Sequence, residues 1–275
     1  DNNSTSICED AAGAIWCADR RNGIVQVFAG HTRVFTAPDA QPPINVTNIC
    51  PDGKDNIWIG TLTGLYQLPA DRSAPIRPLD GSIRPVRSLY CTRGGDMWVG
   101  SGGDLTSGFQ LGYFRQGVYH ALSEADGFHA KQVVAVAEAP DGTVWMGTYE
   151  GEVLEYCAGA LALRLSKETT RAGHIHSLHF DASGALWIGS EHGLLEKKGS
   201  QLRRFMRADG LPDDLISQVM EDDRGRLWLC SRRGFFSVAI ADLDALAECR
   251  SSRVIATTFG QDEGLPDFSA PIGGQ

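Results

Sequence analysis

The sequence predicts an all-β protein, a β-propeller built from four-stranded antiparallel blades. Two observations carry this prediction. Glycine makes up 32 of the 275 residues, about 12% against ~7% in average proteins, and six tryptophans recur at intervals of 42, 40, 47, 42 and 41 residues. A period near 40 residues is typical of propeller blades, each of which is one four-stranded sheet. The structural tryptophans of the six repeats are Trp16, Trp58, Trp98, Trp145, Trp187 and Trp228.

The first two strands of each blade are predicted by the motif around its tryptophan. An apolar residue lies nine positions before the tryptophan, usually Asp six before, usually Gly three before, and a small residue two after. Around Trp228 this motif predicts strands over 216–221 and 226–231, joined by an Asp-x-x-Gly turn. We expect the repeated acids to form such turns rather than a calcium or acid–base site. They are Asp10, Asp52, Asp181 and Asp222.

The two outer strands follow at a second glycine. Residues 64–68 and 193–197 predict a third strand, and residues 201–206 predict a fourth. The second strand is apolar on both faces, so both faces need to be covered. The small residue after the tryptophan leaves room either for the indole or for a neighbouring sheet. It is glycine in four repeats: Gly60, Gly100, Gly147 and Gly189. Residues 240–249 could form a short helical segment.

The repeats predict one propeller domain over 1–275, with six complete blades and the start of a seventh. The segment that opens at Gly210 recurs from Gly264, and the spacing from Gly210 to Trp228 would put a seventh tryptophan at position 282. We therefore expect a fragment of a seven-bladed ring. The expected blades cover roughly 1–40, 41–81, 82–126, 127–168, 169–209 and 210–262, and 263–275 begins the next blade.

Composition excludes several classes of protein. The chain has 25 Lys and Arg against 34 Asp and Glu, a net charge of −9, so nucleic acid is not an expected partner. No apolar run approaches the ~20 residues of a membrane helix, and we expect no membrane contact by this segment. The seven cysteines form no CxxC pair, which argues against a zinc knuckle or a disulfide framework.

The repeats resemble a known family, the two-component regulator propeller repeat of periplasmic ligand-binding sensor domains in hybrid histidine kinases. The resemblance rests on the opening Asp209 to Pro212, on the core apolar-x-x-Asp-x-x-Gly-x-Leu-Trp, and on endings such as Ile59-Gly60-Thr61, and it covers essentially the whole chain. It implies a seven-bladed ring, a periplasmic location, a membrane-anchored parent with a kinase, and a homodimer formed through that parent. The sequence departs from the family's repeat pattern at three kinds of position. Asp55 replaces the turn glycine, Thr92 and Ala139 replace the Asp, and residues 102–108 form an insertion.

Closed propellers bind ligands where loops of several blades converge. In the usual blade order, the segments entering the first strands share one face with the loops between second and third strands. A mouth rich in Arg, His and Tyr could bind a sugar, a carboxylate or a sulfated glycan by bidentate hydrogen bonds and ring stacking. The alternative for each residue is a solvated loop. The candidate ligand-binding residues are Arg20, Arg21, Arg84, Arg87, His129, Lys131, Tyr149, His174, His176, His192, Arg232 and Arg233.

A metal site is the weaker interpretation of the histidines. His174 and His176 would lie on one face of an inner strand and could start such a site, whereas His179 would lie on the other face unless a bulge intervenes. No third ligand is marked by the sequence. We expect no metal, no cofactor and no catalytic residue, and we expect His179 to be a packing residue.

The sequence supports three functions to different degrees. The preferred one is a non-catalytic sensor propeller of a bacterial two-component signalling protein that recognises a small molecule or carbohydrate, with any catalysis in a separate kinase domain. The second is a metal-assisted lyase or hydrolase similar to streptogramin lyase, which would use His174, His176, Glu150 and Glu191. The third is a scaffold that binds a protein along a flat face.

Overall fold

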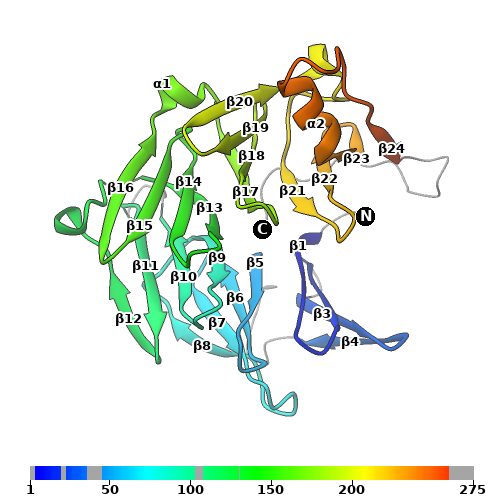
Figure 1. Cartoon of the computed structure of the whole chain (residues 1–275). Helices are drawn as coiled ribbons and strands as arrows, with labels where there is room; N and C mark the ends of the chain where they lie inside the picture. Colours follow the sequence, from blue (N-terminus) through cyan, green and yellow to red (C-terminus); the bar gives the residue numbers. More distant parts are fainter. Residues whose placement is uncertain (1–3, 20–22, 36–44, 103–107, 130, 260–275) are drawn as a thin grey trace. The chain divides into compact units, whose positions relative to one another are not determined.

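The computed structural model describes residues 4–19, 23–35, 45–102, 108–129 and 131–259. These residues form six four-stranded antiparallel sheets, and in each sheet the strands follow one another in chain order (Figure 1). The predicted all-β class with four-stranded blades is therefore confirmed. The expected start of a seventh blade at 263–275 lies outside the described residues. No helix in the described part of the chain is long and apolar enough to cross a bilayer.

The chain divides into two compact units, 1–136 and 137–273, and the division falls within β13. The first unit contains β1 (Ser4–Glu9), β2 (Ile15–Asp19), β3 (Gly23–Phe28), β4 (His31–Phe35), β5 (Val46–Pro51), β6 (Ile57–Thr61), β7 (Leu65–Leu68), β8 (Arg77–Asp80), β9 (Val86–Cys91), β10 (Met97–Ser101), β11 (Gln110–Arg115), β12 (Val118–Ala121) and the 3-10 turn η1 (Glu124–Asp126).

The second unit holds the remaining three blades. Its elements are β13 (Val133–Glu138), β14 (Val144–Thr148), β15 (Val153–Cys157), β16 (Ala160–Leu165), α1 (Lys167–Thr170), β17 (Ile175–Phe180), β18 (Leu186–Ser190), β19 (Gly193–Lys198), β20 (Gln201–Phe205), η2 (Arg207–Asp209), β21 (Gln218–Glu221), β22 (Arg226–Ser231), β23 (Gly234–Ala239), α2 (Ile240–Ala247) and β24 (Thr257–Phe259). Strand β21 starts later than the predicted 216, because the Ile216 N–H donates to the Ser190 carbonyl of the preceding blade at 2.8 Å.

The repeated Asp ties its hairpin turn to the indole of the same blade. In the fifth blade, Asp181 Oδ1 accepts the N–H groups of Ser183 and Ala185 at 2.8 and 2.9 Å, and Oδ2 accepts Trp187 Nε1–H at 2.8 Å. The same link joins Asp10 to Trp16, Asp52 to Trp58 and Asp222 to Trp228, at 2.7, 3.0 and 2.8 Å. The predicted turn-forming role is confirmed, and the indole partner explains the constant spacing of six residues.

The fourth blade lacks this Asp and uses a different acceptor for its indole. At Ala139 there is no carboxylate, and Trp145 Nε1–H donates instead to Thr143 Oγ1 at 3.1 Å. Thr143 Oγ1–H in turn donates to Asp141 Oδ1 at 2.8 Å. A buried indole N–H that lost its acceptor would be costly, so the threonine compensates for the missing acid.

The glycine after the tryptophan makes room for the next blade rather than for the indole. A Cβ placed on Gly100 of β10 would lie 2.8 Å from the Val133 carbonyl oxygen and 2.5 Å from Ser88 Oγ. In the second unit, a Cβ on Gly189 would lie 2.4 Å from Ser177 Oγ and 3.0 Å from the Ile216 carbonyl oxygen. Of the two alternatives that the sequence left open, room for the indole or room for a neighbouring sheet, the structure supports the second.

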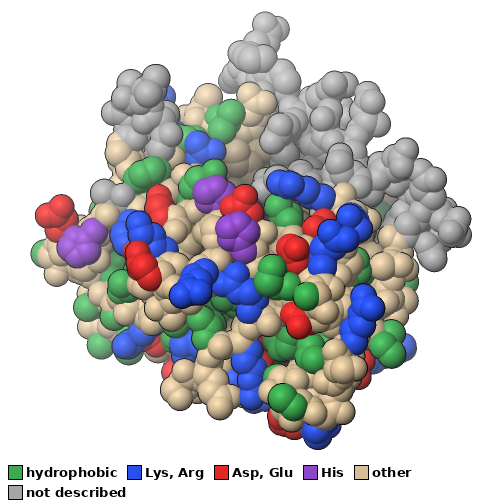
Figure 2. Space-filling model, turned by 90° about the horizontal axis from the view of Figure 1, so that it is seen from above, with side chains coloured by type: hydrophobic (Ala, Val, Ile, Leu, Met, Phe, Trp, Pro, Cys, Tyr) green, Lys and Arg blue, Asp and Glu red, His purple; other side chains and the backbone are tan. Residues whose placement is uncertain are grey.

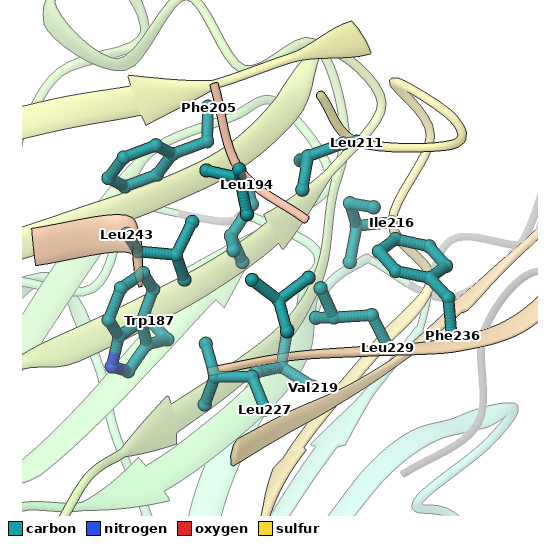
Figure 3. Packing of buried hydrophobic residues seen from close by; sticks show 12 residues of the cluster. Trp187, Leu194, Phe205, Leu211, Ile216, Val219, Leu227, Leu229, Phe236 and Leu243 are labelled. Carbon is teal, nitrogen blue, oxygen red and sulfur yellow. The ribbon is translucent and has the colours of Figure 1, made fainter. Parts of the chain in front are cut away.

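Apolar side chains of neighbouring blades fill the space between the sheets. In the second unit, Trp187 and Leu194 of the fifth blade point toward Leu227 and Leu229 of the sixth, and all four are fully buried (Figure 3). Leu243 of α2 covers the same cluster. Because each such side chain contributes about 1.5–3 kcal/mol on burial, this interface holds the two blades together.

Several of the first strands of the blades carry a β-bulge near their N-terminal ends. In β17, Ile175 pairs with Ser190 and Ser177 pairs with Gly189, which leaves His176 as the extra residue. The same shift occurs in β5 and β9, where Thr47 and Arg87 are the extra residues. The simple alternation that placed His174 and His176 on one face and His179 on the other is therefore interrupted. Bulges re-aim side chains at the ends of strands and often lie beside functional sites.

Candidate functional site

Three loops of the second unit converge on His174. His174 precedes β17, Tyr149 lies between β14 and β15, and Glu191 lies between β18 and β19. Backbone hydrogen bonds join two of these loops, since the Glu191 N–H donates to the His174 carbonyl at 2.9 Å. The rings of Tyr149 and His174 stack with their centroids 3.7 Å apart and their planes at 16°. Tyr149, His174, His176 and Glu191 are called the His174 cluster below.

The position of the His174 ring is fixed by two contacts. His174 Nδ1 lies 2.7 Å from the Tyr149 carbonyl oxygen, and because a carbonyl only accepts, Nδ1 carries the proton. His174 Nε2 lies 3.9 Å from Glu191 Oε2. Glu191 Oε2 also accepts the His174 N–H at 3.4 Å. Gly173, at a φ of +68°, permits this approach, since a Cβ there would lie 2.6 Å from the carboxylate.

His176 is a buried polar side chain whose Nε2 has no hydrogen-bond partner in the described part of the chain. Its exposed fraction is 8%. The next residue, Ser177, is fully buried, and its Oγ also lacks a partner there. Buried polar atoms are nearly always satisfied by protein, water or ligand. The bulge places the unpartnered His176 ring nitrogen two residues from His174, whereas Ser177 Oγ faces Gly189 of the adjacent strand β18.

The electrostatic surroundings keep His176 neutral at pH 7. Burial is the main cause that lowers the pKa of its imidazole to about 4, with smaller lowering contributions from the nearby His174 and Arg232 and an opposing one from Glu191. A neutral imidazole can donate from one ring nitrogen and accept at the other. Figure 2 shows one face of the protein on which histidine side chains lie among carboxylates and cationic side chains.

Stability should depend on pH through His176. Below its unfolded value of 6.5 the unfolded chain gains a proton, whereas the folded protein gains it only near its pKa of about 4. The free energy of unfolding should therefore fall by about 3 kcal/mol as the pH is lowered from 6.5 to 4. We expect His176→Gln to flatten this dependence in urea denaturation series, with Leu163→Ala, an exposed residue of β16, as the control. A His176→Gln profile that parallels the wild type would show that another group dominates.

Arg204 of β20 links the two segments that carry His174 and Glu191, and the sequence analysis does not include it among the candidates. Its guanidinium donates to the carbonyl oxygens of Thr170, Arg171 and His192, the last two at 3.0 and 2.9 Å. Burial lowers the pKa of this guanidinium, and the charge of Arg171 lowers it further. The loop-based selection left Arg204 out because it lies on a fourth strand. Only its three carbonyl partners in the folded chain reveal the role.

The other candidate ligand-binding residues are not members of the His174 cluster. His192 Nδ1 lies 3.3 Å from the Arg171 carbonyl oxygen, and Arg232 and Arg233 are exposed in the loop between β22 and β23. In the first unit, Arg87 Nε–H donates to the Gly102 carbonyl at 3.3 Å. Arg20 and Arg21 lie outside the described residues. The remaining candidates of the first unit precede or enter first strands, as expected: Arg84, His129 and Lys131.

The described residues do not fit a metal ion. Among them, no group of three or more His, Cys, Asp or Glu side chains is placed so that it could hold one. His174, His176 and Glu191 lie near one another, but they do not form such a group. No reaction step is therefore derived through a metal.

The comparison with known families decides what the repeats are. The family described as "Two component regulator propeller" matches residues 40–63 and 210–233. These segments are two-component regulator propeller repeats. The predicted resemblance is thereby confirmed for these two segments, since each contains the Asp-to-Trp core of its repeat, 52–58 and 222–228. No curated protein matches the chain.

Solved structures share the propeller fold with these two-component regulator propeller repeats. The extracellular domain of BT3049 from B. thetaiotaomicron, described as a hybrid two component system, is 19% identical with a TM-score of 0.75 and covers 97% of this chain. The chain spans 35% of that domain, about a third of its length. A similar domain of BT4673 from the same organism, described as a one component system, is 18% identical with a TM-score of 0.61, over 85% of this chain and 38% of that one.

An enzyme also shares the fold. A catalytically inactive variant of virginiamycin B lyase from Staphylococcus aureus, solved with quinupristin, is 11% identical with a TM-score of 0.72. The match covers 96% of this chain and 86% of the lyase. At these identities the likeness establishes the β-propeller fold and leaves the activity to be argued from the residues.

Proposed function

We propose that this chain is a non-catalytic sensor propeller of a bacterial two-component signalling protein, and that the His174 cluster recognises a small molecule or glycan. The observation that carries the proposal is the convergence of three loops on His174, where the exposed ring of Tyr149 stacks on the imidazole and Glu191 Oε2 lies 3.9 Å from Nε2. The buried His176, two residues further along, has a ring nitrogen without a hydrogen-bond partner among the described residues. Tyr149, 44% exposed, offers a face on which a ligand can stack.

Recognition outside the cytoplasm is part of this proposal. The similar domains of BT3049 and BT4673 are extracellular, which supports a periplasmic sensor segment of a membrane-anchored protein that pairs with a second copy. Ligand binding then passes a signal only if the ligand binds one arrangement of the parent more tightly than another. Loops that a rigid sheet positions are common sites of ligand binding, because the sheet fixes where the contacting side chains lie.

A thermal-shift screen tests the proposal. Neutral sugars, uronic acids and small carboxylates are screened against the wild-type protein at pH 7, and at least one class should raise the unfolding temperature. A ligand at 100 times its Kd stabilises the folded state by about 2.7 kcal/mol. Tyr149→Ala should remove the shift because the stacking surface is lost, whereas Leu163→Ala should keep it. A screen without any shift, or a shift that Tyr149→Ala leaves intact, would count against ligand recognition at this cluster.

A lyase is the second candidate, supported by the shared fold with virginiamycin B lyase and by the proximity of His174 to Glu191 at 3.9 Å. Metal analysis of the purified protein and assays of the wild type beside His176→Ala would test it. If the protein contains no metal and shows no activity that depends on His176, the lyase candidate is contradicted and the sensor proposal is unaffected. A protein-binding scaffold would instead be indicated by partner capture that survives Tyr149→Ala.

A further inference from the structure

We infer that the His174 cluster is built for a ligand that carries a protonated amine. The inference rests on the proposed ligand-binding function and adds the chemical class of the group that is bound. It follows from the charge of Glu191, from the exposed ring of Tyr149 and from the hydrogen-bonding capacity of four atoms. These atoms are His174 Nδ1, His174 Nε2, Glu191 Oε2 and His176 Nε2.

The first step concerns the acceptors. Because His174 Nδ1 donates to the Tyr149 carbonyl, the neutral ring has a lone pair at Nε2. That lone pair lies 3.9 Å from Glu191 Oε2, too far for a direct hydrogen bond and close enough for one donor to reach both atoms. A hydrogen-bond donor that enters the space between these two acceptors can bond to both of them.

The second step concerns charge. Among the described residues, the only potential cation within 4 Å of Glu191 is the His174 ring, which carries no charge in the tautomer with the proton on Nδ1, and the Glu191 side chain is 38% exposed. No Lys or Arg of that part of the chain neutralises it. An ammonium group supplies three donors and a positive charge, and a charge-assisted hydrogen bond to a carboxylate is roughly twice as strong as a neutral one.

The third step concerns the ring. Tyr149 is covered on one side by His174 at a centroid distance of 3.7 Å and remains 44% exposed. An aromatic face beside a carboxylate is the arrangement that binds organic cations, through a cation–π contact of about 0.5–2 kcal/mol. The unsatisfied His176 Nε2, with its side chain 8% exposed, adds a polar group to the same cluster.

Matched probes test the amine directly. Benzylammonium, benzyl alcohol and benzoate share one ring and differ only in a cationic, neutral or anionic group, and each is titrated at pH 7 into the isotope-labelled full chain with NMR detection. We expect benzylammonium to bind at least tenfold more tightly than benzyl alcohol and benzoate to give no saturable shifts. Glu191→Gln should weaken the amine at least tenfold, and Tyr149→Leu should weaken it about threefold.

The control variant is Glu150→Gln. Glu150 is an exposed carboxylate next to Tyr149 in the chain, so its loss removes the same charge from the same face and should change amine affinity less than twofold. The inference is overturned if benzyl alcohol or benzoate binds as well as benzylammonium, or if Glu150→Gln weakens the amine as much as Glu191→Gln. In both cases ligand binding at the cluster persists, so the sensor proposal survives. Absence of any binding of benzylammonium also overturns the inference, and the sugar and acid screen then decides on the sensor independently.

Discussion

Replacing Asp181 by alanine is expected to lower the free energy of unfolding by about 3 kcal/mol. The variant deprives the fully buried Trp187 indole of its acceptor and removes the carboxylate that holds the N–H groups of Ser183 and Ala185. The loss should appear as a lower midpoint in urea denaturation followed by tryptophan fluorescence. Asp223→Ala, one residue past the equivalent acid of the sixth blade and exposed, is the control and should change stability by less than 0.5 kcal/mol.

The substitution Asp181→Asn removes the charge of this side chain and keeps its shape. Burial would raise the pKa of the Asp181 carboxyl, but hydrogen bonds from Ser183, Trp187 and Ala185 outweigh it and hold the pKa below 3.8. The carboxylate therefore stabilises the fold above pH 3.8, and this contribution is lost as the pH falls through the folded pKa. The difference between wild type and Asp181→Asn should shrink below pH 4. A difference that stays constant down to pH 2 would contradict the role of the charge.

Gly100→Ala is expected to cost about 2–3 kcal/mol through overpacking. The new methyl group would meet the Val133 carbonyl oxygen at 2.8 Å, and a backbone oxygen in a paired strand cannot move aside as a side chain can. The urea midpoint should fall, whereas Gly81→Ala, which meets nothing within 4 Å, should leave it unchanged. Equal midpoints for the two variants would mean that the strand at Val133 yields easily.

The sequence predicted the blades because their packing is periodic. A buried indole such as Trp187, a turn-forming acid six residues earlier and a glycine two residues later are each required by contacts that recur in most of the blades. Contacts of this kind leave a signal in a single sequence. The same logic shows where substitutions compensate one another, as Thr143 does for the acid that is missing at position 139.

The bulge and the cluster left no comparable signal. The extra residue lies eleven positions before the tryptophan in β5, β9 and β17, so it is Thr47, Arg87 or His176 without any change in repeat length. Because the shift is common to these blades, comparison of the repeats cannot reveal it. The sequence does not predict how closely Glu191 approaches His174, since this distance depends on how two loops fold toward each other.

The link between acid and indole closes within seven residues of chain, as from Asp181 to Trp187. Contacts so near in sequence cost little loop entropy, so each hairpin can form early in folding without waiting for distant strands. The arrangement also makes a blade a transferable unit. A repeat that is duplicated, deleted or exchanged by recombination keeps its own turn intact, and only the sheet-to-sheet fit at positions such as Gly100 must be matched again.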